Sequence, residues 1–287
     1  MLDQAEKLRA LTEKNNIINS SSKPTIITVT SGKGGVGKSN FVVNVSIAIQ
    51  KLGKKVLIFD ADVGMGNDDV LMGFYPKHSI YDIIFDNMEI SDVIIDGPFG
   101  VKLLPGGTGI TRLEGITELQ RERFINKLSS LDDLDYIIMD TGAGVNRDVL
   151  AYISCCHELI ILTTPEPTSI TDAYSLIKAV KHFKIKNSAK IIVNRALNDE
   201  EGKYTFEKFN YAVKNFLKVD LEYMGYISED NKIAQSVRKQ EPFVICYPNC
   251  SASKDIDNIA ARIIGSTFIK DGYGVQTLFR KLFNIFS

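Results

Sequence analysis

The stretch that decides the fold is SGKGGVGKSN, residues 31–40. Its centre fits the pattern G-x-x-x-x-G-K-[ST], in which backbone N–H groups between a strand and a helix surround nucleotide phosphates. The context agrees, because a β-branched run at 25–30 precedes the loop and an apolar run from Phe41 follows it. In such a loop Lys38 reaches the outer phosphates and Ser39 offers a hydroxyl to Mg2+. The predicted phosphate-binding residues are Gly32, Lys33, Gly34, Gly35, Val36, Gly37, Lys38, Ser39 and Asn40.

Around this loop, short apolar runs alternate with segments of helical period. The apolar runs lie at 25–30, 56–60, 101–104, 136–140, 159–162, 190–194 and 223–227. Alternation of this kind is typical of a parallel sheet covered by helices on both faces. We therefore expect an α/β fold of the P-loop NTPase type, with seven or eight strands in a doubly wound, mainly parallel sheet. A chain of 287 residues, 44% of them hydrophobic, can bury the core that such a fold needs.

Three carboxylates follow predicted strands. Asp60 and Asp62 come after the second strand, and Asp140 ends the strand at 136–140. In an open α/β sheet the carboxyl ends of the strands gather the ligands, so these side chains are expected beside the phosphate loop. Each could instead cap the turn or helix that follows it. Their order after the loop favours a metal and water site, with a glycine-containing loop at 141–144 that can approach the outermost phosphate.

Lys33 adds a second positive charge early in the loop, where an ordinary phosphate loop needs none. This makes the segment similar to the loops of the deviant Walker A ATPases, the MinD, ParA and nitrogenase-reductase class of SIMIBI proteins. The resemblance implies that the chain hydrolyses ATP with Mg2+ and forms an ATP-dependent homodimer, in which Lys33 contacts the partner's nucleotide. It also implies that Asp62 positions the attacking water. The implied catalytic residues are Lys33, Lys38 and Asp62, and the implied Mg2+ residues are Ser39, Asp60, Asp62 and Asp140.

The same resemblance indicates where the adenine base is bound. Asn194 and Arg195 end a later strand and match the family's base-binding position, where a side-chain amide can meet the edge of the ring. The segment at 227–230 stands where the family often has Pro-Glu-Asp against the base. Ile227 replaces that proline, so the resemblance does not fix the details of base contact.

The C-terminal segment carries an apolar stripe at helical spacing. The stripe is formed by Val275, Leu278, Phe279, Leu282, Phe283 and Phe286. Such a face is buried either in a membrane interface, with Arg280 and Lys281 near anionic headgroups, or against the protein's own body. The terminal position and the glycines at 272 and 274 favour the membrane surface. The resemblance points the same way, because MinD-like proteins end in a membrane-targeting helix and can hold it docked until ATP dimerises them.

Over most of its length the chain resembles the FlhG branch of the family, also called FleN or YlxH, which regulates flagellar number and placement. The matching segments are DQAEKLR at 3–9, DADVGMGNDDVLMG at 60–73, DTGAGV at 140–145 and TTPEPTSITDAYSLIK at 163–178. The resemblance implies that the N-terminal element stimulates the SRP-type GTPase FlhF, with Gln4 and Arg9 as the contacting residues. Further implied partners are the flagellar C-ring or a transcriptional regulator. The implied location is the cytoplasm, peripheral on the inner face of the cell membrane.

We expect four segments: a partner-activating helix at 1–14, a linker at 15–24, the ATPase domain at 25–270 and a membrane-targeting helix at 271–287. The net charge of −1 provides no basic field, so no sequence-specific nucleic-acid partner is expected. The four cysteines form no metal or disulfide framework, which indicates a reducing compartment.

Four alternatives remain at this point. The first is a nucleotide-gated scaffold whose hydrolysis is incidental, and the second is a MinD- or ParA-like ATPase that positions a division site or other cargo. The third is a ParA-like DNA partitioner, which would need exposed basic clusters, whereas the terminal stripe is apolar. The fourth is an electron-transfer reductase, which the cysteine positions disfavour.

Overall fold

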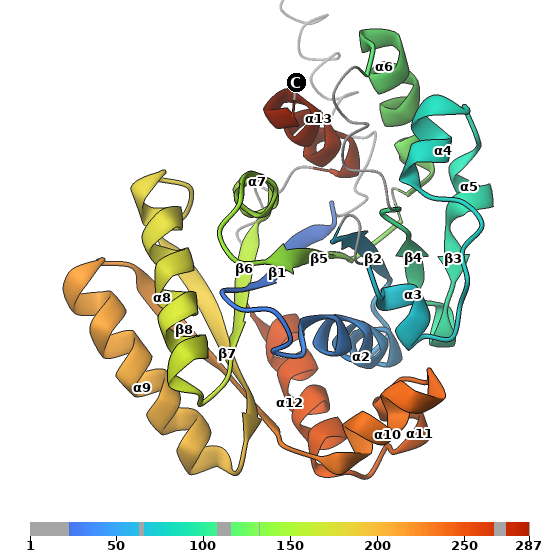
Figure 1. Cartoon of the computed structure of the whole chain (residues 1–287). Coiled ribbons are helices and arrows are strands. Elements are labelled where there is room, and N and C mark those ends of the chain that lie inside the picture. The colour runs from blue at the N-terminus through green and yellow to red at the C-terminus, as the bar shows by residue number, and fades with distance from the viewer. Residues whose placement is uncertain (1–22, 63–65, 108–115, 132, 267–273, 287) are drawn as a thin grey trace, which may run out of the picture.

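An eight-stranded sheet forms the centre of the computed structural model, which describes residues 23–62, 66–107, 116–131, 133–266 and 274–286 (Figure 1). The strand order is β3-β4-β2-β5-β1-β6-β7-β8, and only β3 runs antiparallel to its neighbour. The expected doubly wound, mainly parallel sheet is therefore confirmed. The strands are β1 (Thr25–Ser31), β2 (Val56–Ala61), β3 (Ile95–Asp96), β4 (Lys102–Leu104), β5 (Tyr136–Ala143), β6 (Glu158–Thr163), β7 (Ser188–Ala196) and β8 (Asp220–Ser228).

Helices cover both faces of the sheet and bury two separate apolar clusters. One face carries α2 (Lys38–Lys51), α3 (Asp68–Leu71), α10 (Asn231–Lys239), α11 (Phe243–Cys246) and α12 (Ser251–Gly265). The other carries α4 (Ile80–Phe85), α5 (Ile90–Val93), α6 (Glu118–Lys127), α7 (Arg147–Ser154), α8 (Pro167–His182), α9 (Asp199–Phe216) and α13 (Val275–Phe286). Two short 3-10 turns, η1 (Pro98–Gly100) and η3 (Leu128–Leu131), complete the regular structure of the described residues.

Helix α2 shows why tertiary burial decides the local structure here. Its sequence, KSNFVVNVSIAIQK, is rich in β-branched residues, which are poor helix formers. Nine consecutive positions, 41–49, are nevertheless buried between the sheet and α12, and the hydrophobic ones belong to one apolar cluster. Burial of apolar side chains contributes about 1.5 to 3 kcal/mol each, which outweighs a propensity loss of a few tenths per residue.

The order of the central strands places the predicted carboxylates next to each other. Strand β5 lies between β1 and β2, and Asp60 of β2 is in register with Asp140 of β5. Asp140 is also in register with Val29 of β1, two residues before the phosphate loop begins. The carboxyl ends of three adjacent parallel strands therefore meet at one point.

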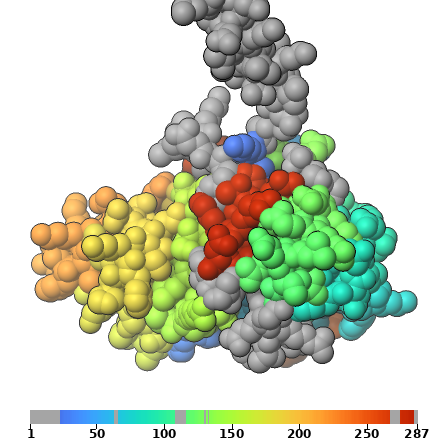
Figure 2. All heavy atoms as spheres, turned by 90° about the horizontal axis from the view of Figure 1, so that it is seen from above, coloured from blue at the N-terminus to red at the C-terminus, as the bar shows by residue number. Residues whose placement is uncertain are grey.

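Helix α13 lies in a groove of the protein's own surface, beside α6 and α7 (Figure 2). Its stripe residues Val275, Leu278, Phe279, Leu282 and Phe283 are at most 6% exposed. The Phe279 ring packs against Phe59 and Phe124, with centroid distances of 5.4 and 5.0 Å. Of the two placements considered for this stripe, the structure has the docked one; the side chain of Phe286 lies outside the description. In the described part of the chain, no helix combines the length and apolarity needed to cross a bilayer.

A half-buried histidine, His157 at the start of β6, makes the stability of the fold depend on pH. The Ile26 N–H donates to His157 Nδ1 at 3.0 Å. Burial, together with the positive charges of Lys186 and Lys281, lowers the pKa of His157 from 6.5 to about 4. The neutral imidazole is thus the folded form, whereas the unfolded chain binds a proton below pH 6.5.

We expect the free energy of unfolding to be highest above pH 6.5 and to fall as the pH drops toward 4. With allowance for the partial exposure of the ring, the loss due to His157 is about 1 to 2 kcal/mol. Denaturant unfolding of the wild type and of His157→Gln across this range measures it. The variant, which keeps an acceptor for Ile26, should show a flatter profile; parallel profiles would contradict the assignment.

Candidate functional site

The phosphate loop connects β1 to α2 and depends on glycines at defined positions. Gly35 and Gly37 have φ angles of +75° and +94°, a left-handed conformation that other residues adopt only at a cost. Gly32 is needed for a different reason, because a Cβ there would collide with the backbone of Asp172 in α8. The loop is thereby held between α8 and the start of α2, with its backbone available to an anion.

Lys38 points into the sheet and pairs with Asp140. The Nζ to Oδ1 distance is 2.9 Å, and the side chains are only 9% and 1% exposed. Burial alone would lower the pKa of Lys38, but the charge and hydrogen bond of Asp140, together with the nearby Asp62 and Asp68, more than offset burial, so the pKa is raised. The ammonium is therefore charged, and it lies beside the phosphate loop at the carboxyl ends of β1 and β5.

Asp60 and Asp62 lie in the same site and differ in environment. Asp60 is 6% exposed, and its Oδ1 accepts a hydrogen bond from the Asp62 N–H at 3.2 Å. Burial and the nearby Asp140 raise the pKa of Asp60 to about 7. Asp62 is more open, and its carboxylate lies against Gly142, where an added Cβ would be 3.2 Å from Oδ1. Asp62 and Gly142 are thus in direct contact. Gly142 lies in β5, which continues to Ala143, so most of the loop expected at 141–144 is strand.

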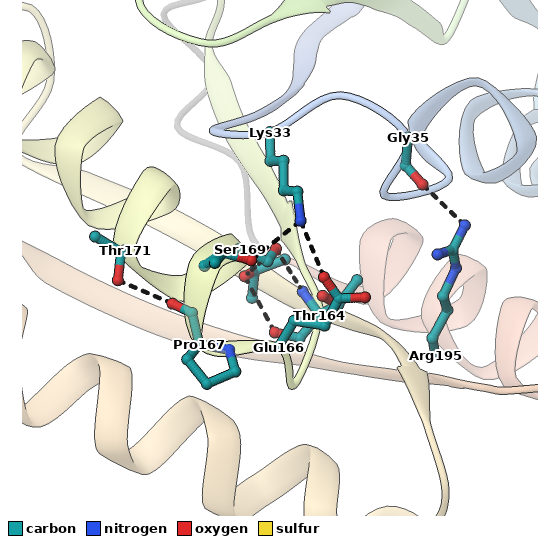
Figure 3. Close-up of polar contacts among 10 residues, drawn as sticks. Lys33, Gly35, Thr164, Glu166, Pro167, Ser169, Thr171 and Arg195 are labelled. Carbon is teal, nitrogen blue, oxygen red and sulfur yellow. Dashed lines mark hydrogen bonds and ion pairs between the residues drawn. The ribbon is translucent and has the colours of Figure 1, made fainter.

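Lys33 does not point at the phosphate position in this structure. Its Nζ contacts Glu166 Oε2 and Thr168 Oγ1, each at 3.0 Å, at the start of α8 (Figure 3). The Lys33 side chain is 40% exposed, so it can exchange these partners at little cost. Sequence reasoning did not assign a role to either partner, although both lie in the segment TTPEPTS that carried the family resemblance.

Asn194 and Arg195, predicted to bind adenine, contact the backbone of the phosphate loop. Figure 3 shows Arg195 reaching Gly35 on the side of the loop away from Lys33. Asn194 Nδ2 donates to the Val36 carbonyl at 2.7 Å, and Arg195 Nη2 donates to the Gly35 carbonyl at 2.8 Å. They also line a cavity of about 470 Å³ beside Gly37. Other residues lining this cavity are Asn40, Ile227, Glu229, Asp230, Ile233 and Phe243. A cavity with apolar walls and a few polar groups suits a planar base, and Ile227 forms part of the wall.

Sequence reasoning missed one carboxylate of the site. Asp68, the first residue of α3, is fully buried, and the charges acting on it are those of Asp140, Asp60 and Lys38. In the sequence it looks like an ordinary polar residue at a helix start, so its burial could not be seen. The predicted partner residues Gln4 and Arg9 lie outside the described residues, as do positions 63–65 that follow Asp62.

Comparison with known proteins agrees with the fold. The AAA domain family model matches residues 24–193. The antiactivator FleN of Pseudomonas aeruginosa is 35% identical over 239 residues, 83% of this chain and 85% of FleN. The flagellum site-determining protein YlxH of Helicobacter pylori is 33% identical over 92% of this chain and 91% of its own. In the MinC:MinD cell division complex of Aquifex aeolicus, the matching chain has a TM-score of 0.68 and 28% identity, covering 87% of this chain and 99% of its own.

The sheet topology, the phosphate loop and the carboxylates behind it define a P-loop nucleotide hydrolase. Within that class the chain belongs to the ParA/MinD family of ATPases, together with FleN and YlxH. The family and the ATPase activity expected from the sequence are thereby confirmed.

Proposed function

We propose that this protein is a MgATP-driven switch that regulates the number or placement of flagella. The observation that carries the proposal is the buried Lys38–Asp140 pair at the end of the phosphate loop, with Asp60 and Asp62 beside it. The flagellar role is supported by the similarity to FleN and YlxH over more than four fifths of the chain.

The residues around the loop fit a magnesium nucleotide. Asp140 Oδ2 is buried and has no ammonium, amide or hydroxyl donor among the described residues, and the Asp68 carboxyl is hydrogen-bonded to the Asp140 side chain. With the nucleotide bound, Asp140 can accept a hydrogen bond from a metal-bound water instead. Ser39, next to Lys38 at the start of α2, provides a hydroxyl ligand. Bound Mg2+ would neutralise charge on the phosphates as the bond to the leaving group breaks. Lys38 exchanges Asp140 for the outer phosphates, and Asp62 accepts a hydrogen bond from the attacking water and orients it.

Dimerisation belongs to the same proposal. Lys33 leaves Glu166 and Thr168 and binds the nucleotide of a second copy, which ties dimer formation to ATP. The dimer then acts on partners: the N-terminal element with Gln4 and Arg9 stimulates an SRP-type GTPase of the FlhF kind, and a C-ring component or transcriptional regulator is the cargo. The domain at 25–270 provides the switch, and the helix after 271 provides attachment to the inner membrane face.

Asp62→Ala is the test of the switch. We expect ATP turnover to fall at least a hundredfold while ATP-dependent dimerisation persists, because Asp62 acts on water and not on the phosphates. Phosphate release and light scattering with a nonhydrolysable analogue measure the two properties. Asp92→Ala, which removes an exposed carboxylate from α5, is the control and should leave both unchanged.

If Asp62→Ala abolishes dimerisation together with turnover, the assignment of Asp62 to the water is wrong. If turnover is lost but flagellar number and protein localisation in cells stay normal, the protein is a nucleotide-gated scaffold, and the proposed switch fails. A monomer that does not bind MgATP at all would reject the proposal as a whole.

A further inference from the structure

Two phenylalanines are exposed where α8 and α9 end. Phe183 directly follows α8 and is 61% exposed, and Phe216, the last residue of α9, is 75% exposed. The two helices are in contact, and the strands that follow them pair in register, Ser188 of β7 with Asp220 of β8. Both phenylalanines therefore belong to one corner of the molecule, at the amino ends of β7 and β8. Single exposed apolar residues are common, so the surroundings of this pair decide whether it marks a binding surface.

Lysines flank the two phenylalanines. The exposed lysines at this corner are Lys184, Lys214 and Lys218. None of them forms an ion pair with a described residue. The sequence carries no aspartate or glutamate at 173–197 or at 208–219, and the first acid after the second range is the exposed Asp220. A chain with a net charge of −1 thus has a corner in which positive charge predominates. We define the basic corner as Phe183, Lys184, Lys214, Phe216 and Lys218.

Two of these lysines occupy backbone positions that favour glycine. Lys184 and Lys218 are each the second residue after their helix, and their φ angles are +55° and +53°. A left-handed residue at this position commonly ends a helix, and it is usually glycine because a Cβ makes the conformation costly. A lysine in the last turn, such as Lys214, is explained by the helix dipole alone. At the two left-handed positions glycine would be the more stable choice, so the charge there points to a role other than folding.

An anionic lipid surface has the chemistry that complements the basic corner. Phenylalanine enters the boundary between headgroups and acyl chains, while lysines beside it bind the anionic headgroups. The helices α8, α9 and α13 cover the same face of the sheet (Figure 2). Lys281 of α13 and Lys186 after α8 both lower the pKa of His157, so α13 lies close to the loop after α8. Helix α13 itself offers little free positive charge, since Arg280 is ion-paired with Glu122 at 2.6 Å.

We propose that the basic corner is a second membrane contact, which binds anionic phospholipid headgroups beside α13. The proposal rests on the proposed membrane attachment and adds to it a surface that does not require α13 to undock. A single short anchor gives marginal binding, and stable attachment takes a second signal such as a basic patch. Nucleic acid, the other common polyanion, is a poorer match, because it needs an extended basic track and the chain has no positive net charge.

The double variant Lys184→Gly with Lys218→Gly separates membrane binding from stability. A lysine near an anionic surface contributes about fivefold to membrane partition, so loss of two should lower the partition about 25-fold. We expect this loss for vesicles of phosphatidylcholine with phosphatidylglycerol, and no change for phosphatidylcholine alone. The melting temperature should rise by about 2 °C or more, because glycine is favoured at both positions. Co-sedimentation of the full chain with a nonhydrolysable ATP analogue and thermal unfolding measure the two effects.

The matched control is Lys77→Gln with Lys254→Gln, which removes two exposed lysines outside the basic corner. It should leave the partition within about twofold of the wild type. Phe183→Ser with Phe216→Ser tests the apolar part of the corner and should lower the partition at least about tenfold. Unchanged partition of the glycine variant, or an equal loss in the control, would overturn the proposal. Loss of duplex DNA binding with vesicle binding intact would also overturn it, since the corner would then bind nucleic acid.

Failure of the basic corner is distinguishable from failure of the proposed function. If the wild type binds vesicles and the corner variants bind them equally well, attachment through α13 stands and the basic corner is rejected. If the wild type binds neither kind of vesicle in any nucleotide state, the proposed membrane attachment itself is wrong. Phosphate release by the glycine variant should equal that of the wild type, because the corner lies at the amino ends of the strands, away from the phosphate loop.

Discussion

Lys38→Met is expected to abolish nucleotide binding and to destabilise the nucleotide-free protein at the same time. The methionine keeps the length of the side chain but removes the charge from the phosphate loop, so ATP turnover should fall at least a thousandfold. Asp140, only 1% exposed, then loses its ion-pair partner. Breaking a buried pair in this way costs about 3 to 5 kcal/mol. Phosphate release and denaturant unfolding measure the two losses.

The double variant Lys38→Met with Asp140→Asn distinguishes the structural role of the pair from its chemical role. Removing both charges avoids the uncompensated carboxylate, so we expect most of the lost stability to return. ATP turnover should stay at the level of Lys38→Met, because the phosphates still lack their cation and Mg2+ has lost Asp140. Recovery of turnover in the double variant would show that Lys38 serves mainly to neutralise Asp140. Equal instability of the single and double variants would show that the pair does not stabilise the fold.

The fold could be predicted because burial of the central strands on both faces determines both the sequence pattern and the tertiary structure. Parallel strands buried on both faces need continuous apolar runs, and the expected strand at 25–30 is β1, Thr25–Ser31. At the sheet edges this constraint weakens. Strand β8 begins at Asp220, three residues before the expected start. Its first residues alternate between exposed and half-buried positions, so they lack the continuous apolar run by which the other strands were predicted. The two-residue strand β3 has too little pattern to be recognised.

The site could be predicted only as far as local spacing carries information. Asp60 and Asp140 lie toward the carboxyl ends of β2 and β5, and Asp62 directly follows β2, so the positions of these strands in the sheet bring the three carboxylates to the loop. Asp68 and Glu166 follow no such rule. Their roles depend on which elements pack against the loop, and an acid at a helix start looks the same whether it is fully buried, as Asp68 is, or exposed, as Glu166 is. The apolar stripe of α13 was ambiguous for a similar reason, because a docked helix and a membrane-surface helix need the same spacing.

Phe124→Ala is expected to weaken the docking of α13 on the ATPase domain while leaving the sequence of α13 unchanged. Phe124 lies on α6, is fully buried, and contacts the rings of Phe279 and Phe283 with centroid distances of 5.0 and 5.6 Å. Truncating a buried phenylalanine costs about 3 to 5 kcal/mol, and part of this is lost from the docking of α13. A loss of 1.4 kcal/mol raises the undocked fraction tenfold. Faster hydrogen exchange in residues 275–286 measures the release, with thermal unfolding as the check that the domain remains folded.

The same variant tests whether the released helix binds a membrane surface. If it does, Phe124→Ala should sediment with anionic liposomes without ATP, whereas the wild type should require ATP. Phe279→Ala is the matched comparison, because it weakens docking by a similar amount but also removes one of the large apolar residues that would enter the lipid, worth about 1.5 to 3 kcal/mol. We therefore expect Phe124→Ala to bind liposomes at least tenfold more tightly than Phe279→Ala. The opposite result is that α13 exchanges faster but neither variant binds liposomes, even with ATP present. It would show that α13 does not bind membranes and serves only as part of the core.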